Sequence, residues 1–482
     1  MSLATMLVAG CAVGPDYVRP PVEVPAAYKE AGLWKPAEPH AVEAHDWWER
    51  YGDTTLSGLV AQANDANQNI REAEGQYRQA KAIADAARAG FFPSVGAAAT
   101  AGRAVSSVTG NGATGFGVSL SASWEPDLWG GVRRAVESGE AGAQASADDL
   151  AAARLSIQAA LAEDYLQLRY IDVQRELYAR TTIAYAKALQ LTQAQYRAGV
   201  VLRSDVALAE TQLKTAQAQA VDLDAQRSQL EHAIAILIGR PPAAFALPAV
   251  SPADAFEARM PAIPPSLPSA LLESRPDIAA AERRAALANA NIGVAKAAYY
   301  PSLALGASGG ASAGTVASLL ATPSRVWSLG ATLAETLFDG GLRSAHTAQA
   351  VAAFDVAVAQ YKQTVLGSFQ QVEDDLATLA VLERETALQD EAVAAARLAE
   401  RLALAQYRGG TVNYLTVVAA QALALSNERT ALQLRSRQLT TSVALITATG
   451  GGWSPGRDDV AATRAAAPPA PAIETVSTSS GR

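Results

Sequence analysis

Two stretches of the chain alternate between apolar and small polar side chains with a period of two. The apolar positions are Phe116, Val118, Leu120, Ala122 and Trp124 in the first stretch, and Trp327, Leu329, Ala331 and Leu333 in the second. This period predicts β-strands with one apolar and one polar face. A partner segment precedes each strand, so we expect two β-hairpins, over 93–126 and 301–337.

Longer segments after each hairpin, over 132–239 and 342–450, predict helical hairpins. The first helix, from about 132 to 197, has apolar residues in one seven-residue register at Leu150, Ile157, Ile171, Tyr178 and Tyr185. About 60 helical residues span ~90 Å, which exceeds one compact domain, so this helix is expected in a coiled-coil or bundle-like shaft.

A shorter helix is expected before each β-hairpin, at about 54–90 and 269–299. Ser274 is the predicted N-cap of the second of these helices, and Ser204 is the predicted N-cap of the helix that returns from the first helical tip. Gly199 is expected in the left-handed conformation that ends many helices.

The order of elements occurs twice, because the chain contains an internal duplication. The segment Phe91-Phe92-Pro93-Ser94 matches Tyr299-Tyr300-Pro301-Ser302, and Ala194–Gly199 matches Ala405–Gly410. We therefore divide the chain into two repeats, 54–239 and 269–450, joined by a proline-rich linker (240–268). Before the first repeat come a possible truncated signal segment (1–10) and an extended strap with the start of an equatorial region (11–53). A disordered tail (451–482) follows the second repeat.

Four amphipathic strands leave two unpaired sheet edges, which are costly in lipid because each unsatisfied backbone group there costs several kcal/mol. Four strands are also too few for a membrane barrel, whose minimum is about eight. Closure therefore requires strands from several subunits. The sequence alone does not choose between two, three or more copies.

Composition argues against catalysis and against nucleic-acid binding. The net charge is −8 with a pI near 5.3, which gives no general attraction to nucleic acid. The chain contains four histidines and one cysteine, and it has no Walker loop, nucleophile elbow or HExxH motif. We expect no enzyme, no metal site and no cofactor other than a covalent lipid.

The candidate for that lipid is Cys11. The segment Leu7-Val8-Ala9-Gly10-Cys11 matches the pattern of a bacterial lipobox, in which small residues precede an acylated cysteine. The ten residues before Cys11 contain no Lys or Arg, so either the natural start lies upstream or the segment is not cleaved. An ordinary thiol near an apolar N-terminus is the alternative.

Over about residues 11 to 450 the chain resembles the TolC-like outer-membrane efflux proteins, in the NodT or OprM-like lipoprotein subfamily. The segments that carry the resemblance are Cys11 with Val13–Pro20, Trp47-Trp48, Arg275–Ile278, Tyr300–Ser302, Phe338–Gly341 and the two Gln-Tyr-Arg-x-Gly tips. The resemblance implies an α+β membrane protein. Its homotrimer would form a twelve-stranded β-barrel, with four strands per chain, in the Gram-negative outer membrane. The barrel would continue into a long periplasmic α-helical barrel that meets a periplasmic adaptor and an inner-membrane pump of the RND type.

Three sets of residues are the candidate functional sites. The helical tips, expected to dock the adaptor, carry Arg197, Gly199, Asp205, Arg408, Gly409 and Gly410, and the glycines alone would also explain tight turns. Leu415 and Val418 are the candidate apolar constriction of the resting pore. Phe91, Phe92, Tyr299 and Tyr300 are candidates for a membrane-interface belt, with packing at the joint as the alternative.

The leading functional hypothesis is a passive conduit through which a pump expels drugs or other small molecules across the outer membrane. The same architecture could serve type I secretion of a polypeptide. A periplasmic adaptor or scaffold lipoprotein is a third hypothesis, but such a protein would not need two alternating hairpins.

Overall fold

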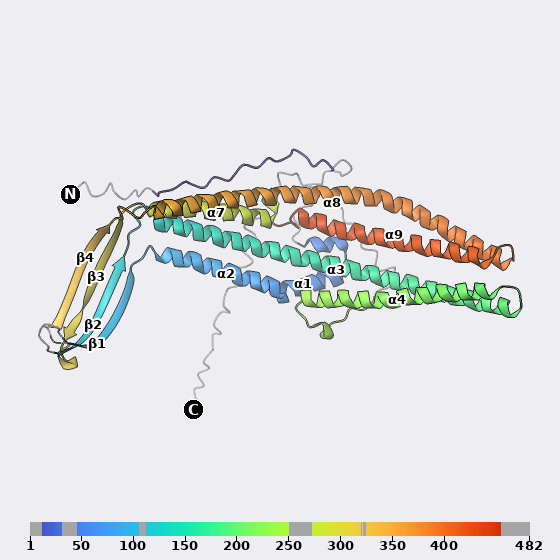
Figure 1. Ribbon diagram of the computed structural model, residues 1–482, viewed down its shortest axis with the longest axis horizontal. Coiled ribbons are helices and arrows are strands. Elements are labelled where there is room, and N and C mark those ends of the chain that lie inside the picture. The colour runs from blue at the N-terminus through green and yellow to red at the C-terminus, as the bar shows by residue number, and fades with distance from the viewer. Residues whose placement is uncertain are drawn as a thin grey trace, which may run out of the picture.

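The computed structural model of the protein describes residues 12–30, 46–105, 112–249, 272–319, 321 and 324–454 (Figure 1). Cys11, the segment 1–10, most of the linker and the tail from residue 455 lie outside the described residues.

Two very long helices run the length of an elongated shaft (Figure 1). They are α3 (Gly131–Arg197) and α8 (Leu342–Arg408), each of 67 residues and therefore about 100 Å long. The prediction of a helix too long for one compact domain is confirmed. Each long helix turns back at its far end into a 35-residue helix, α4 (Arg203–Leu237) or α9 (Tyr414–Ala448).

Shorter helices complete the half of the shaft next to the sheet. These are α1 (Thr54–Ala66), α2 (Gln68–Ala89) and α7 (Pro276–Ala297). In Figure 1, α2 and α4 follow one another beside α3, and α7 and α9 do the same beside α8. Short 3₁₀ helices lie at Trp47–Tyr51, Pro242–Ala244 and Val316–Ser318.

The predicted single helix over 54–90 is wrong, because it is broken at Asn67. The Asn67 side chain accepts hydrogen bonds from the backbone N–H groups of Asn69 and Ile70, which starts α2. Its amide also donates to the carbonyl of Leu237 at 2.7 Å. Asn67 therefore caps the start of α2 and binds the end of α4. The local periodicity of the sequence could not predict this long-range contact.

The predicted N-cap at Ser274 is also wrong, since α7 begins at Pro276 with Arg275 as the N-cap. Proline at the first helical position holds the preceding residue in an extended conformation, and Arg275 has φ −109° and ψ 122°. Ser274 lies in a separate helical turn before this break, and its buried hydroxyl makes no hydrogen bond to any residue that the structure describes.

At the other end of the shaft, two hairpins join into one antiparallel sheet of order β1-β2-β3-β4. The strands are β1 (Ser94–Val105), β2 (Gly112–Trp124), β3 (Ser302–Ala313) and β4 (Arg325–Ala334). Both predicted hairpins are present. The junction between repeats is the β2–β3 pair, in which Trp124 faces Leu305 and Phe116 faces Ala313. In the described strands β1 and β4 are the outer strands of this sheet.

The largest apolar core lies at the waist of the shaft, where α1, α3, α8 and α9 meet. Trp47 is 1% exposed there, and the Tyr51 hydroxyl lies 2.7 Å from Ser442 Oγ. Gly451 is buried beside Trp47, so the packed body continues past the predicted start of the tail, at least to Ser454. Among the described helices, none is long and apolar enough to cross a membrane.

Candidate functional site

The sheet separates apolar from small polar side chains onto opposite faces. The register pairs Leu120 with Ala97 and Trp327 with Gly309. Paired residues lie on the same face, so these pairs show which side chains of the four strands share a face. One face carries Val95, Phe116, Val118, Leu120, Trp124, Leu303, Leu305, Trp327, Leu329 and Leu333. Several of these side chains are open, with Trp327 82% and Leu329 78% exposed, whereas Phe116 is half-buried.

The opposite face is mostly serine, glycine, threonine and alanine. Its hydroxyls bond across strands, with Ser94 Oγ 2.7 Å from Ser123 Oγ and Ser308 Oγ 2.8 Å from Ser328 Oγ. A sheet with one exposed apolar face and one hydroxyl-rich face suits a wall between lipid and water.

Aromatic side chains gather where the shaft meets the sheet. Phe92 is 71% exposed, and Tyr300 stacks on Trp129 with ring centroids 4.9 Å apart. Phe91 and Tyr299 lie at the same junction and are 37% and 41% exposed. The structure therefore brings the four predicted aromatics to one level, where they are open rather than part of a buried joint.

Sequence reasoning missed two further apolar residues at this level, Leu337 and Phe338. They are 89% and 88% exposed. Their signal was available, since a leucine and a phenylalanine stand in sequence three and four residues after the end of β4.

The extended strap runs along the shaft from this junction (Figure 1). Its first described residues lie against the start of α3: Val13 N donates to Trp129 O at 3.0 Å, and Gly130 leaves room for Ala12. Arg134, buried on α3, pairs with Asp16 at 2.8 Å. These contacts fix the segment that follows Cys11 at the end of the shaft nearest the sheet.

Farther along, the strap is held by single polar contacts to the second repeat. The Tyr17 hydroxyl donates to Glu282 at 2.7 Å, and Arg19 donates to the Tyr361 hydroxyl at 3.2 Å. Burial and the Glu282 carboxylate raise the pKa of Tyr17 far above its ordinary value, so this hydroxyl stays a donor.

The two helical tips at the far end of the shaft have the same backbone geometry. Gly199 has φ 73° and Gly410 has φ 74°, while Gly409 is right-handed with φ −79°. In each tip two reverse hydrogen bonds close the helix end, including Val200 N to Gln195 O at 2.9 Å and Thr411 N to Gln406 O at 3.0 Å. The predicted left-handed Gly199 is confirmed.

The predicted N-cap at Ser204 is wrong. The N-cap lies two residues earlier, at Leu202, and helix α4 begins at Arg203. Asp205 accepts from the backbone N–H of Leu202 at 3.3 Å, so its carboxylate serves the start of the helix. In the second tip Asn413 caps α9 by accepting from Thr416 N at 3.2 Å.

Both tips are open to solvent. Arg197 and Arg408 are exposed. Val200 and Leu202 are 71% and 72% exposed, and sequence reasoning missed them as surface residues. Two open aliphatic side chains among the five residues between α3 and α4 give the first tip an apolar contact surface beside its arginine.

Directly above the tips, all four shaft helices meet in a small cluster. Ala209, Ala403, Tyr407, Tyr414 and Val417 are buried in it. The rings of Tyr407 and Tyr414 lie 5.3 Å apart, and burial chiefly raises the pKa of Tyr414 to about 12.

The polar links between the two helical hairpins at this level are uncharged. The Tyr407 hydroxyl on α8 donates to Gln195 Oε1 on α3. Gln212 Nε2 on α4 donates to Gln421 Oε1 on α9 at 3.3 Å. We call these two hydrogen bonds the tip clasp.

The two predicted constriction residues lie in different environments. Leu415 is 56% exposed, whereas Val418 is half-buried and lines a cavity of about 430 Å³ with Tyr178, Tyr185 and Gln212. They are three residues apart on α9 and therefore share one side of that helix.

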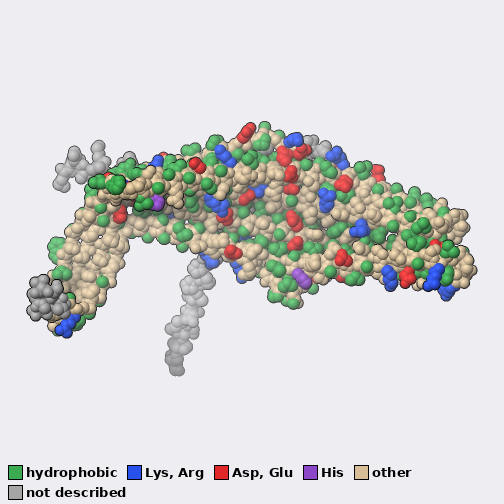
Figure 2. Space-filling model, in the orientation of Figure 1, with side chains coloured by type: hydrophobic (Ala, Val, Ile, Leu, Met, Phe, Trp, Pro, Cys, Tyr) green, Lys and Arg blue, Asp and Glu red, His purple; other side chains and the backbone are tan. Residues whose placement is uncertain are grey.

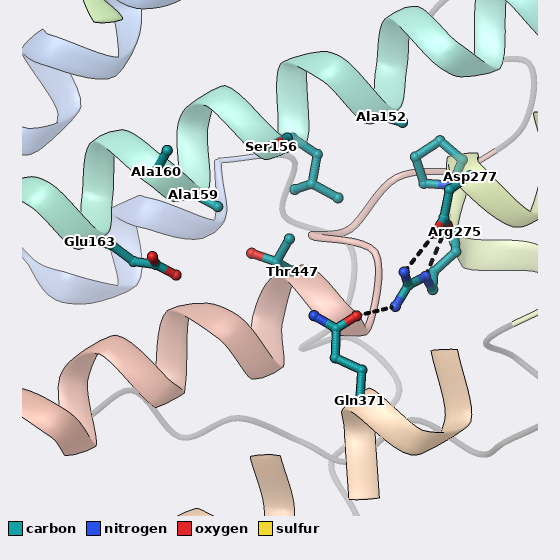
Figure 3. Close-up of a pocket in the computed structure, with 11 residues that line it drawn as sticks. Ala152, Ser156, Ala159, Ala160, Glu163, Arg275, Asp277, Gln371 and Thr447 are labelled. Carbon is teal, nitrogen blue, oxygen red and sulfur yellow. Dashed lines mark hydrogen bonds and ion pairs between the residues drawn. The ribbon is translucent and has the colours of Figure 1, made fainter. Parts of the chain in front are cut away.

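A second cavity, of about 330 Å³, lies at the waist (Figure 3). Arg275 is at one end, where it donates to Asp277, to Gln371 at 3.1 Å and to the carbonyl of Ala448 at 2.9 Å. Glu163 is at the other end. Arg275 closes the C-terminal end of α9, so the cavity is a joint between the repeats.

Asp375 is one helical turn after the cavity-lining Gln371 on α8, and one of its carboxylate oxygens is buried without a hydrogen-bond partner among the described residues. Burial, followed by Asp374 and Glu163, raises the pKa of Asp375 to about 6. In the part of the chain that the structure describes, no three His, Cys, Asp or Glu side chains are grouped to hold a metal ion.

Comparison with known families decides the class of protein. A model of the outer membrane efflux protein family matches residues 59–240 and 267–451. The chain belongs to this family. The two matched segments correspond to the two repeats, and the resemblance to TolC-like efflux proteins is confirmed.

Individual relatives agree with this assignment. The efflux protein is 31% identical over 433 residues to the pyoverdine export outer membrane protein OpmQ of Pseudomonas aeruginosa, covering 87% of this chain and 90% of that one. It is 28% identical over 464 residues to the toluene efflux pump outer membrane protein TtgF of Pseudomonas putida, covering 93% and 95%. The solved outer-membrane channel OprN superposes with a TM-score of 0.84 at 30% identity, covering 92% of this chain and 100% of that chain.

This efflux protein is thus an outer-membrane channel with the TolC-like fold, and its activity is transport rather than catalysis.

Proposed function

We propose that three copies of the chain form a passive conduit that carries small molecules from an inner-membrane pump across the outer membrane. The observation that carries the proposal is the sheet, which has an open apolar face and two outer strands, β1 and β4, at its edges. In lipid these edges must pair. Three copies give twelve strands, an even number above the minimum of about eight.

The helical shaft would close in the same way and extend into the periplasm. Its exposed leucines and valines, among them Val221 on α4 and Leu388 on α8, would then face helices of the neighbouring copies. The hydroxyl-rich face of the sheet would line the water-filled lumen.

Covalent lipid on Cys11 would anchor each copy. The strap supports this proposal, because Ala12 lies at the start of α3, next to the aromatic junction. Cys11 is the neighbouring residue in the sequence, so a lipid on it would be attached one residue from this junction. Two or more acyl chains give stable anchoring, whereas one gives marginal binding.

The tips are proposed to meet a periplasmic adaptor. Arg197 and Arg408 would supply charge, Gly199 and Gly410 would set the turns, and Asp205 would hold the first turn of α4. Val200 and Leu202 add apolar surface.

Leu415 and Val418, repeated in each copy, are proposed to narrow the resting pore. An apolar ring can gate ions and water by dewetting. Ala419 beside them carries no charge, so it supplies no acidic ring at this position.

The cargo is proposed to be small molecules rather than a polypeptide. Pyoverdine and toluene, the cargoes in the names of two relatives, differ from one another, so they suggest a conduit whose specificity comes from its pump. The pump would be of the RND type.

The experiment is purification from membranes in detergent, followed by planar-bilayer recording and by drug-susceptibility profiling of a deletion strain. We expect a heat-modifiable trimer on gels, discrete conductance, and sensitisation of the strain to several small molecules. A water-soluble monomer without conductance would refute the conduit. Loss of a secreted polypeptide with unchanged drug susceptibility would favour type I secretion instead.

A further inference from the structure

The sheet and its turns contain very few charges. Segments 94–124 and 302–334 include two charged residues, Arg103 in β1 and Arg325 in β4, and no Asp or Glu. Figure 2 shows basic side chains at the end of the sheet farthest from the helices. Both arginines are exposed, and neither forms an ion pair with any residue that the structure describes.

Both arginines lie on the apolar face of the sheet. The register pairs Arg103 with Thr114, two residues along each strand from the pair Ala101 and Phe116. It pairs Arg325 with Ala311, two residues along each strand from the pair Gly309 and Trp327. Since residues two apart in a strand share a face, each guanidinium continues a row of lipid-facing side chains.

The two arginines also lie equally far along their strands from the end that meets the shaft. Arg103 follows Ser94, the first residue of β1, by nine positions, and Arg325 precedes Ala334, the last residue of β4, by nine. Nine residues at about 3.4 Å span about 31 Å of strand. With a tilt of about 35–45° the rise is about 22–25 Å, equal to the apolar band of an outer-membrane barrel.

This height decides the environment of the guanidinium groups. An arginine at the middle of the band would be destabilising by about 2–4 kcal/mol, but near the interface that penalty falls almost to zero. Both groups therefore reach the level of the lipid headgroups at the outer rim, opposite the aromatic junction.

Barrel closure would bring the two arginines together. Arg103 and Arg325 are on the two outer strands of the sheet, so β4 of one copy would pair with β1 of the next, at about 4.8 Å. Each seam would then hold two guanidinium groups at one height, a geometry that suits bidentate binding of a phosphate.

We propose that Arg103 and Arg325 form three phosphate-binding clamps, one at each seam, for the phosphorylated glycolipid headgroups of the outer leaflet. The inference rests on the proposed trimer, with its helices in the periplasm. Charge complementarity supports this occupant, because these two cations have no carboxylate partner in the sheet and the apolar row below them would hold the acyl chains.

The test uses the purified full-length trimer in detergent and native mass spectrometry with diphosphorylated lipid A as the probe. We expect the affinity to fall about five-fold in Arg103→Gln or Arg325→Gln and about thirty-fold in the double variant, since each arginine near an anionic surface contributes a similar increment. The double lysine variant should retain binding within about three-fold. Arg203→Gln, in the distant first tip, is the matched control and should bind as the wild type does.

Two further arms identify the phosphate source, with lipid A stripped of both phosphates and inorganic phosphate as probes. Stripped lipid A should bind the wild type no better than the double variant, and inorganic phosphate should not displace lipid A at equal concentration. Equal binding of stripped lipid A, displacement by inorganic phosphate, or unchanged affinity of the double variant would each overturn the clamp. Planar-bilayer conductance is recorded for the wild type and for every variant. Absence of conductance in the wild type would refute the conduit and would leave the lipid-binding site to be judged by the affinities alone.

Discussion

The tip clasp allows a quantitative test of how the resting channel stays closed. The Tyr407 hydroxyl joins α8 to α3 through Gln195, and Tyr407 is 6% exposed. Tyr407→Phe removes this hydroxyl and leaves the ring against Tyr414. The link between the two helical hairpins is therefore weakened without opening a cavity.

The size of the effect follows from the kind of bond. A neutral intramolecular hydrogen bond contributes about 1 kcal/mol net. If the hairpins must separate for the pore to open, losing the bond raises the open population about five-fold. The partner groups are uncharged, so the gain should be the same in 0.1 M and 1 M salt.

The assay is the leak current of single channels in planar bilayers at low voltage. Tyr196→Phe is the matched control, because Tyr196 is at the same level but 45% exposed. A double-mutant cycle with Gln195→Ala should give a coupling of about 1 kcal/mol. A Tyr407→Phe channel as tight as the wild type, or a coupling of zero, would refute the clasp.

Three further outcomes are expected. Leu415→Ser should make the resting pore leakier, with unchanged single-channel conductance removing Leu415 from the constriction. The folded-state pKa of Asp375 exceeds the usual carboxyl value, so the stability of the folded chain should fall as the pH rises from about 4 to 6 and stay low at higher pH. Asp375→Asn should then raise the free energy of unfolding by about 1 kcal/mol at pH 8, a value discounted for partial exposure, and change it little at pH 4. The same gain at both pH values would exclude titration of Asp375 as the cause. Gly410→Ala should lower stability by about 1 kcal/mol because φ is 74°, whereas Gly409→Ala, at φ −79°, should be tolerated, and equal melting temperatures of the two variants would contradict this.

Several features of the chain could be predicted because they depend on local periodicity. The alternation around Leu120 and Leu329 predicted the strands and even which residues share a face, since a strand's period of two is fixed by its backbone. The duplication predicted that both helical tips turn alike, and Gly199 and Gly410 have nearly equal φ values.

The failed predictions have two kinds of cause, one long-range and one local. Asn67 breaks a helix because it bonds to Leu237, 170 positions later, and Ser274 lost its predicted capping role to the geometry imposed by Pro276. Nothing in the local pattern distinguishes Asn67, because a polar side chain inside a helical segment is usually solvated, whereas Pro276 was a local signal two residues from Ser274.

The sequence by itself determined the elements, their order and the need for a shared wall, since an amphipathic strand carries its own period and its own unsatisfied edges. Only the tertiary structure decided that Tyr407 meets Gln195, that the strap begins at the sheet end of the shaft, and that Arg103 and Arg325 lie on the two outer strands of one sheet. Those facts depend on distances between segments that are far apart in the chain, and no local pattern of side chains specifies such distances.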